Sequence, residues 1–326
     1  MKEIKITEIE NIKIGSAENR EAGTGCTVVI CEGGMAAGLD VRGGGPASRE
    51  SELLKPMAAA GEIHAVLLSG GSAFGLDAAG GVMRYLEAKN VGFDVGITKV
   101  PLVCESCLFD LGVADFRTRP DAAMGIAACE AAEKGNYRDG NFGAGTGATV
   151  GKLHGIEYGM KSGIGSYAVQ VGELKVGAIV AVNALGDIYD WRTGEKVAGL
   201  LAKDKQTFLS TEDEVYKSCE VVENKFVGNT TIGIVITNGK FQKSQLCKVA
   251  GMAHDGYARS IRPVHTSADG DSIYAVSVGD VAADQDMVGA LAARVMSEAI
   301  LRAVESADSA YGLISAADRR RRMNPA

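Results

Sequence analysis

The chain has 326 residues, of which 46% are hydrophobic and 23% are charged. These fractions are those of a folded globular protein and exclude an intrinsically disordered chain. A net charge of −7 disfavours a nucleic acid or an anionic membrane as partner, because binding to either requires a positively charged surface.

The opening residues Met1-Lys2-Glu3-Ile4-Lys5 carry mixed charges, unlike the apolar stretch of a signal peptide. No apolar run reaches the length of a transmembrane helix. The seven cysteines are an odd number and lie mostly in apolar sequence, which predicts reduced thiols: Cys26, Cys31, Cys104, Cys107, Cys129, Cys219 and Cys247. These features predict a cytoplasmic protein.

The first predicted elements alternate between strand and helix. An apolar run over 64–71 predicts a strand that ends in two glycines, and apolar residues at helical spacing predict a helix over 74–89. A second helix is predicted over 120–135. A strand pair is predicted over 167–183 with its turn at Gly172-Glu173, and its run 176–182 is apolar enough to be covered on both faces.

The last third of the chain follows the same alternation. The polar segment 203–225 is predicted to be an exposed connection, and the β-branched run 228–237 after it predicts a strand. A helix is expected to follow through Ala253, then a strand over 272–278 and an amphipathic helix over 287–304. This order favours an α/β unit within a layered sandwich.

Several signals point only weakly to chemistry. The glycine-rich run 143–152 resembles a nucleotide loop but lacks the Walker glycine and the hydroxyl residue after Lys152. Cys104 and Cys107 have the spacing of a zinc or redox pair without a second pair, which favours two core thiols. The arginines over 319–322 are expected to form a solvated tail.

Ser72 stands where a strand turns into a helix, as the nucleophile of a serine hydrolase does. The Gly-x-Ser-x-Gly pattern fails, however, because Phe74 replaces the second glycine. The four histidines, at positions 64, 154, 254 and 265, have no evident triad context.

Thr230 begins the β-branched strand directly after Asn229. A threonine in this position is usually only a strand residue. The alternative is an N-terminal nucleophile: its hydroxyl attacks the Asn229 carbonyl, the acyl group moves to oxygen, and water releases a new N-terminus. The freed α-amine then serves as the base for the neighbouring hydroxyl, so no histidine is required.

The sequence resembles the self-cleaving aminopeptidase family that includes L-aminopeptidase/D-amidase-esterases, β-peptidyl aminopeptidases and 6-aminohexanoate (nylon) oligomer hydrolases. Its two aspartates at 269 and 271 are most similar to those of the nylon-oligomer branch. The resemblance covers most of the chain and rests on ordered blocks at 41–46 with Arg49-Glu50, 68–76, 109–112, 143–152, 182–184, 228–233, 262–266 and 269–271.

This resemblance implies a four-layer αββα sandwich in one domain over 1–326, cut into chains 1–229 and 230–326. It implies that Thr230 is the nucleophile, that Lys152 is a cation lowering the pKa of the new amine, and that Asn183 donates to the oxyanion. Asp269 and Asp271 would orient the amine and the lysine. A homotetramer of processed protomers, with no cofactor, is expected.

Other possibilities remain open at this stage. A single-chain serine esterase using Ser72 and a phosphate-binding module using the glycine run are the alternative functions. A metal site is the alternative role for Asp269 and Asp271, together with Asp280 and Asp284, and it requires that these ligands converge on one point. The segment 101–107 departs from the family pattern, so the substrate is left open among α-peptides, D-amino-acid amides, β-peptides and nylon oligomers.

Overall fold

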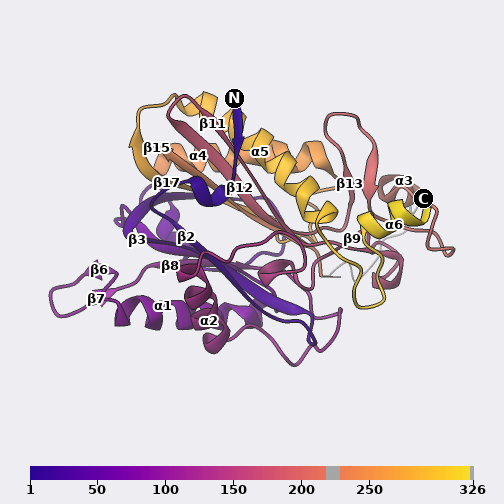
Figure 1. Ribbon diagram of the computed structural model, residues 1–326, viewed down its shortest axis with the longest axis horizontal. Helices are drawn as coiled ribbons and strands as arrows, with labels where there is room; N and C mark the ends of the chain where they lie inside the picture. The colour runs from indigo at the N-terminus through magenta and orange to yellow at the C-terminus, as the bar shows by residue number, and fades with distance from the viewer. Residues whose placement is uncertain (218–227, 324–326) are drawn as a thin grey trace.

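The computed structural model describes residues 1–217 and 228–323. Two β-sheets lie face to face, and a pair of long helices covers the outer face of each (Figure 1). Three separate apolar cores fill the spaces between these four layers. The predicted αββα sandwich is therefore confirmed.

The first sheet carries the predicted nucleophile. Its strands are antiparallel except for the parallel pair β15 and β17, and they run in the order β1 (Lys2–Ile4), β11 (Ile164–Val171), β12 (Leu174–Asn183), β15 (Thr230–Gly239), β17 (Ser272–Val281) and β3 (Thr24–Val41). β12 is buried along almost its whole length on both faces, as its apolar run predicts.

The second sheet is built around the first half of β3. Its strands are β2 (Lys13–Asn19), β3, β5 (Ile63–Ser69), β8 (Val103–Cys107) and β4 (Ala47–Arg49), with β5 and β8 parallel. Residues 26–30 of β3 pair with β5, whereas residues 36–41 pair with β17 of the first sheet. One long strand thus ties the two sheets together.

The helices follow the predicted pattern. α4 (Lys243–Ser260) and α5 (Gln285–Glu305) pack together on the first sheet, and α1 (Ala78–Ala88) and α2 (Ala122–Glu133) pack together on the second (Figure 1). Asp121 caps α2, because its side chain accepts a hydrogen bond from the Met124 amide. Among the described residues, no helix combines the length and apolar character needed to cross a membrane.

Short elements complete the chain. The small strands are β6 (Phe93–Asp94) with β7 (Lys99–Val100), β9 (Thr149–Val150) with β10 (Met160–Lys161), and β13 (Asp187–Tyr189) with β14 (Lys196–Ala198) and β16 (Ile261–Arg262). Single 3-10 turns lie at Ile6–Glu8, Ser51–Leu54, Ser72–Asp77, Gly143–Gly145 and Ile156–Tyr158.

Two expectations about polar segments are wrong in part. The connection predicted over 203–225 contains the helix α3 (Thr211–Lys217). Its first residue, Thr211, is buried, and the Thr211 amide and hydroxyl both donate to Asp187. Residues 218–225 of this segment, with Cys219, lie outside the described residues. The arginines over 319–322 belong to α6 (Ala316–Met323). Arg319 does not lie in a free tail, because its guanidinium stacks on Phe208 and donates to the Gln206 carbonyl.

Candidate active site

The pairing of β12 with β15 places the predicted nucleophile beside the predicted oxyanion donor. Asn183, the last residue of β12, lies opposite Thr230, the first residue of β15. Asn183 is fully buried and Thr230 is 5% exposed. The register of one strand pair therefore brings together two residues that lie far apart in the sequence.

The carbonyl of Asn229 is held by two donors. The backbone N–H of Gly270 donates to it at 3.1 Å, within a short parallel bridge between Asn229 and Asp269. The hydroxyl of Thr230 also donates to this carbonyl oxygen. The oxygen of the predicted scissile bond is thus polarised by a backbone donor, and the predicted nucleophile lies next to the bond.

Gly270 leaves the space that the Thr230 hydroxyl occupies. A Cβ atom on Gly270 would lie 2.7 Å from Thr230 Oγ1 and 3.0 Å from the Gly45 carbonyl oxygen. The first of these distances is too short for a real contact, so only glycine fits here without a shift. The glycine between the two predicted aspartates has a steric reason that the sequence analysis missed.

Lys152 is buried next to the same peptide segment. Its Nζ donates to the Asn183 side-chain oxygen at 2.7 Å, to the Gly228 carbonyl at 3.1 Å and to the Asn183 carbonyl at 3.3 Å. Burial lowers the pKa of Lys152 to about 7, against the opposing charges of Asp269 and Asp110. Near neutral pH this lysine is therefore divided between the ammonium and the free amine.

Both the oxygen and the nitrogen of the Asn183 side-chain amide form hydrogen bonds in the described structure. Its oxygen accepts from Lys152 and from the amide and hydroxyl of Thr149. Its nitrogen donates to the Phe109 carbonyl at 2.9 Å and to the Gly228 carbonyl at 3.2 Å. The donor that is predicted to bind the oxyanion thus already holds the segment that precedes Thr230.

The two predicted aspartates have different partners. One oxygen of Asp271 accepts from the Thr231 amide at 2.7 Å, next to the predicted nucleophile. Asp269 accepts from the amide and hydroxyl of Thr266. Burial and the neighbouring charge of Asp271 raise the pKa of Asp269, and the charge of Asp269 in turn favours the ammonium form of Lys152.

The glycine-rich block after β3 forms backbone hydrogen bonds with these two aspartates. The amides of Arg42 and Gly43 donate to the Asp271 carbonyl, and the Gly45 amide donates to the Asp269 carbonyl at 2.9 Å. The block at 41–46, which the sequence analysis used only for the resemblance, therefore fixes the turn that faces Thr230.

Asp110 is a buried acid to which the sequence analysis gave no role. Its carboxylate accepts from the Thr24 hydroxyl and from the Gly71 amide, both at 2.7 Å. Burial raises its pKa to about 6, and its charge acts on Lys152 and on the fully buried Lys161. The block at 109–112 thus positions the Phe109 carbonyl, which holds Asn183, and supplies a counter-charge for two buried lysines.

The glycine run 143–152 does not form a phosphate loop. All ten of its residues are buried. Lys161 donates to the carbonyls of Gly145 and Ala148, and a Cβ on Gly147 would meet the Gly23 carbonyl and the Asp110 side chain. The run is therefore packed inside the protein beside an acid, which does not favour the binding of a phosphate group.

Ser72 resembles an elbow serine in its backbone only. It lies at the turn after β5 with φ +53°, and its amide donates to the Leu108 carbonyl. Within residues 1–217 and 228–323, no histidine or carboxylate is hydrogen-bonded to its hydroxyl. The serine-esterase alternative therefore lacks its base.

The remaining candidates have structural partners. Asp280 pairs with Lys240 at the surface, and Asp284 caps α5, so neither joins Asp269 and Asp271. The part of the chain that the structure describes holds no group of three or more metal-ligating side chains. Cys104 and Cys107 are both buried free thiols, as the sequence analysis predicts.

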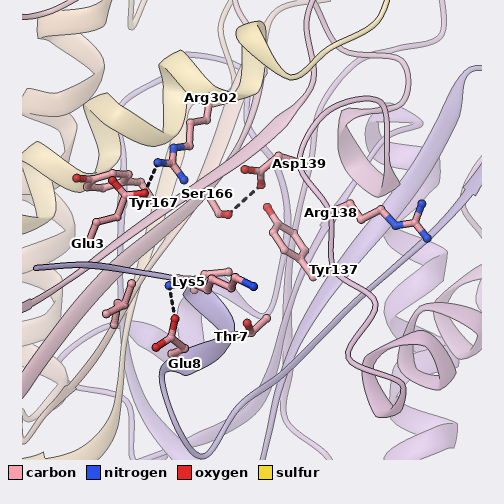
Figure 2. Close-up of a pocket in the computed structure, with 12 residues that line it drawn as sticks. Glu3, Lys5, Thr7, Glu8, Tyr137, Arg138, Asp139, Ser166, Tyr167 and Arg302 are labelled. Atoms are coloured by element: carbon pink, nitrogen blue, oxygen red, sulfur yellow. Dashed lines mark hydrogen bonds and ion pairs between the residues drawn. The ribbon is translucent and has the colours of Figure 1, made fainter.

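A hollow near the N-terminus lies away from these residues. It has a volume of about 390 Å³ and is lined by residues that include Tyr137, Asp139, Ser166 and Arg302 (Figure 2). The Ser166 hydroxyl donates to Asp139 there, and Arg302 pairs with Glu3. None of the five predicted catalytic residues lines this hollow. All five are instead buried, at 5% exposed or less.

Known proteins resemble this chain in both sequence and fold. The sequence profile of peptidase family S58 matches residues 5–316. The chain belongs to peptidase family S58. An uncharacterized aminopeptidase of Mycobacterium leprae is 35% identical over 339 residues, which cover 94% of this chain and 92% of the relative. This S58 protein is accordingly a hydrolase of amide bonds.

More distant relatives carry more specific names. A 6-aminohexanoate-oligomer endohydrolase of Kocuria is 29% identical over 316 residues, covering 91% of this S58 chain and 85% of the relative. The solved L-aminopeptidase D-Ala-esterase/amidase of Ochrobactrum anthropi matches with a TM-score of 0.72 at 17% identity, over 97% and 91% of the two chains. That structure is described as a variant of the Ntn-hydrolase fold, and the likeness shows the fold.

Proposed function

We propose that this protein is an amidase that cuts its own Asn229–Thr230 bond and then uses Thr230 as an N-terminal nucleophile. The two products, 1–229 and 230–326, would remain together in one domain. The observation that carries the proposal is the contact of the Thr230 hydroxyl with the Asn229 carbonyl, which the Gly270 N–H also binds.

The self-cleavage needs only groups at this site and water. The hydroxyl oxygen of Thr230 attacks the carbonyl carbon of Asn229, and its proton passes to the free amine of Lys152. The Gly270 N–H binds the carbonyl oxygen as negative charge develops. The C–N bond then breaks, and the leaving nitrogen takes up the proton and becomes the free Thr230 amine. Water hydrolyses the resulting ester, which frees the Asn229 carboxylate and restores the Thr230 hydroxyl.

The mature enzyme would use the same groups on a substrate. Departure of Gly228 and Asn229 from the site would release the Asn183 amide nitrogen, which would donate to the oxyanion of the substrate. Lys152 as the ammonium would lower the pKa of the Thr230 amine and favour its free-base form. The amine then accepts the hydroxyl proton, and an acyl-enzyme ester forms and is hydrolysed.

The substrates would be small peptides, amino-acid amides or 6-aminohexanoate oligomers. Membership of a peptidase family and relatives named as an aminopeptidase and as an oligomer endohydrolase support this range. We also propose the homotetramer of processed protomers, which sedimentation of the purified protein would test.

Denaturing mass spectrometry tests the proposal. The wild type should give two fragments, the smaller beginning at Thr230, whereas Thr230→Ala should give one inactive chain. Ser72→Ala is the matched control and should cut itself and hydrolyse amides as the wild type does. A Thr230→Ala protein that still hydrolyses amides would contradict the proposed nucleophile, and an inactive Ser72→Ala protein would favour the serine esterase.

A further inference from the structure

Asp271 has a second partner that the proposed mechanism does not use. Its Oδ2 atom accepts from the side-chain Nδ1 of His265 at 2.9 Å and from the backbone amide of His265 at 3.2 Å. Its Oδ1 atom accepts from the Thr231 amide at 2.7 Å. The carboxylate therefore connects a histidine to the residue that follows the nucleophile.

The hydrogen bonds define which nitrogen of His265 carries the proton. Because a carboxylate only accepts, Nδ1 must carry a proton and donate it to Asp271. In the described part of the chain, Nε2 is buried and has no hydrogen-bond partner. The side-chain hydrogen bond that holds this ring is therefore the one from Nδ1 to Asp271.

The ring of His265 is fixed by two residues of α4. His254 meets it edge-on with the ring centroids 4.7 Å apart, and Tyr257 stacks on it at 5.9 Å. The Nε2 atom of His254 lies 3.1 Å from the Asp40 carbonyl, to which it donates. Burial lowers the pKa of His254 to about 4, so its ring is neutral near pH 7.

We infer that His265 is a positioning residue for the cleavage reaction. Its Nδ1–H donates to one oxygen of Asp271 and fixes the carboxylate. The other oxygen then accepts from the Thr231 amide and holds Thr230, the first residue of β15, in place. The backbone amide of His265 already anchors the turn, so the ring adds a second, charge-assisted bond to the same carboxylate oxygen. This inference rests on the proposed function, because it concerns the placement of Thr230.

The φ angle of His265 allows the ring contact to be separated from the backbone. This angle is +59°, a left-handed conformation that asparagine and glycine adopt more readily than other residues. In His265→Asn the side-chain NH₂ can replace Nδ1–H as the donor. In His265→Gly the backbone conformation is kept and the donor is lost. The pair therefore isolates one hydrogen bond.

The experiment measures self-cleavage of newly synthesised precursor and, on the processed protein, kcat and KM for a peptide or 6-aminohexanoate oligomer. We expect His265→Gly to lower the cleavage rate and kcat by about tenfold to a hundredfold with KM unchanged. His265→Asn should restore most of both rates. Because His265 acts through Asp271, adding His265→Gly to Asp271→Asn should cause little further loss.

The outcomes separate this inference from the proposed function. Full activity of His265→Gly, equal losses in the glycine and asparagine variants, or additive losses with Asp271→Asn would each overturn the role of His265. A wild type that hydrolyses amides without any fragment beginning at Thr230 would instead overturn the proposed function. Circular dichroism of each variant checks that the loss is not a loss of fold.

Discussion

Gly270→Ala tests the geometry of self-cleavage at its tightest point. The added Cβ would lie 2.7 Å from Thr230 Oγ1, whereas ordinary contacts begin at 3.4 Å, so the hydroxyl or the turn must move by about 0.7 Å. Alanine keeps the backbone N–H that binds the Asn229 carbonyl, so the substitution changes only the space available. Since a misplacement of about 1 Å can cost about a hundredfold in rate, we expect cleavage of the precursor to slow by roughly that factor.

The assay is a time course of precursor cleavage after cell-free synthesis, followed by denaturing mass spectrometry. Overpacking should also lower the free energy of unfolding by about 1–3 kcal/mol, which urea denaturation measures. Gly61→Ala is the matched control, because a Cβ there meets nothing within 4 Å, and it should cleave at the wild-type rate. A folded Gly270→Ala precursor that cleaves as fast as the wild type would refute the steric argument.

Two further predictions concern pH. Because burial lowers the pKa of Lys152 to about 7, the free amine that accepts the Thr230 proton becomes more abundant as the pH rises. The rate of self-cleavage should therefore increase about tenfold per pH unit below pH 7 and level off above it. A rate that stays constant between pH 5.5 and about 8 would contradict this role. Burial also raises the pKa of Glu105 to about 8, so between its ordinary value of 4.5 and 8 the folded chain holds a proton that the unfolded chain has lost. The free energy of unfolding should therefore fall as the pH rises through that window. In Glu105→Gln this fall should be smaller by up to about 1.4 kcal/mol per pH unit, as measured by urea denaturation at pH 5 to 7.5. The same fall in the variant and the wild type would contradict the prediction.

The elements predicted correctly are those whose burial is continuous or one-sided. β5 and β12 are apolar runs with little interruption, and α2 and α5 repeat apolar residues at helical spacing. In each case local sequence and tertiary packing favour the same conformation. The bounds of these elements consequently differ from the prediction by only a few residues.

β3 shows why other parts of the fold could not be predicted. It spans 18 residues and contains four glycines, so neither alternation nor a continuous apolar run marks it. Its first half pairs with β2 and β5, and its second half pairs with β17, more than 230 residues later in the chain. The strand conformation of β3 thus depends mostly on hydrogen bonds to residues of β2, β5 and β17.

The same reasoning applies to the polar segments. Thr211 and Arg319 were expected in exposed sequence because their neighbours are charged. Thr211 is buried by two hydrogen bonds to Asp187, and Arg319 stacks on Phe208. Such contacts depend on which loops the fold brings together, and local composition carries no information about them.

Some residues of the candidate site act through their side chains, and others act through their backbone. Thr230 stands out because its hydroxyl begins a strand and can attack the preceding carbonyl, whereas the roles of Lys152 and Asn183 follow from the family resemblance. Gly270 offers only an N–H and an absent Cβ, and the Phe109 carbonyl is a group that every residue has. Residues that act through their backbone leave no mark in residue type, so they become visible only when the contact is seen.

His265 is the intermediate case, since its side chain has recognisable chemistry but its partner does not stand beside it in the sequence. Asp271 follows six residues later, and the Thr231 amide that completes the chain belongs to another strand. A sequence search for a histidine in a triad looks for a hydroxyl nucleophile as its partner, whereas here the hydroxyl is expected to use its own amine. If processed Thr230 uses its own amine as proposed, the histidine has no hydroxyl to activate, and its side-chain contact is to the carboxylate that holds the Thr231 amide. These groups come from different segments of the chain, so their contact is visible only in the structure.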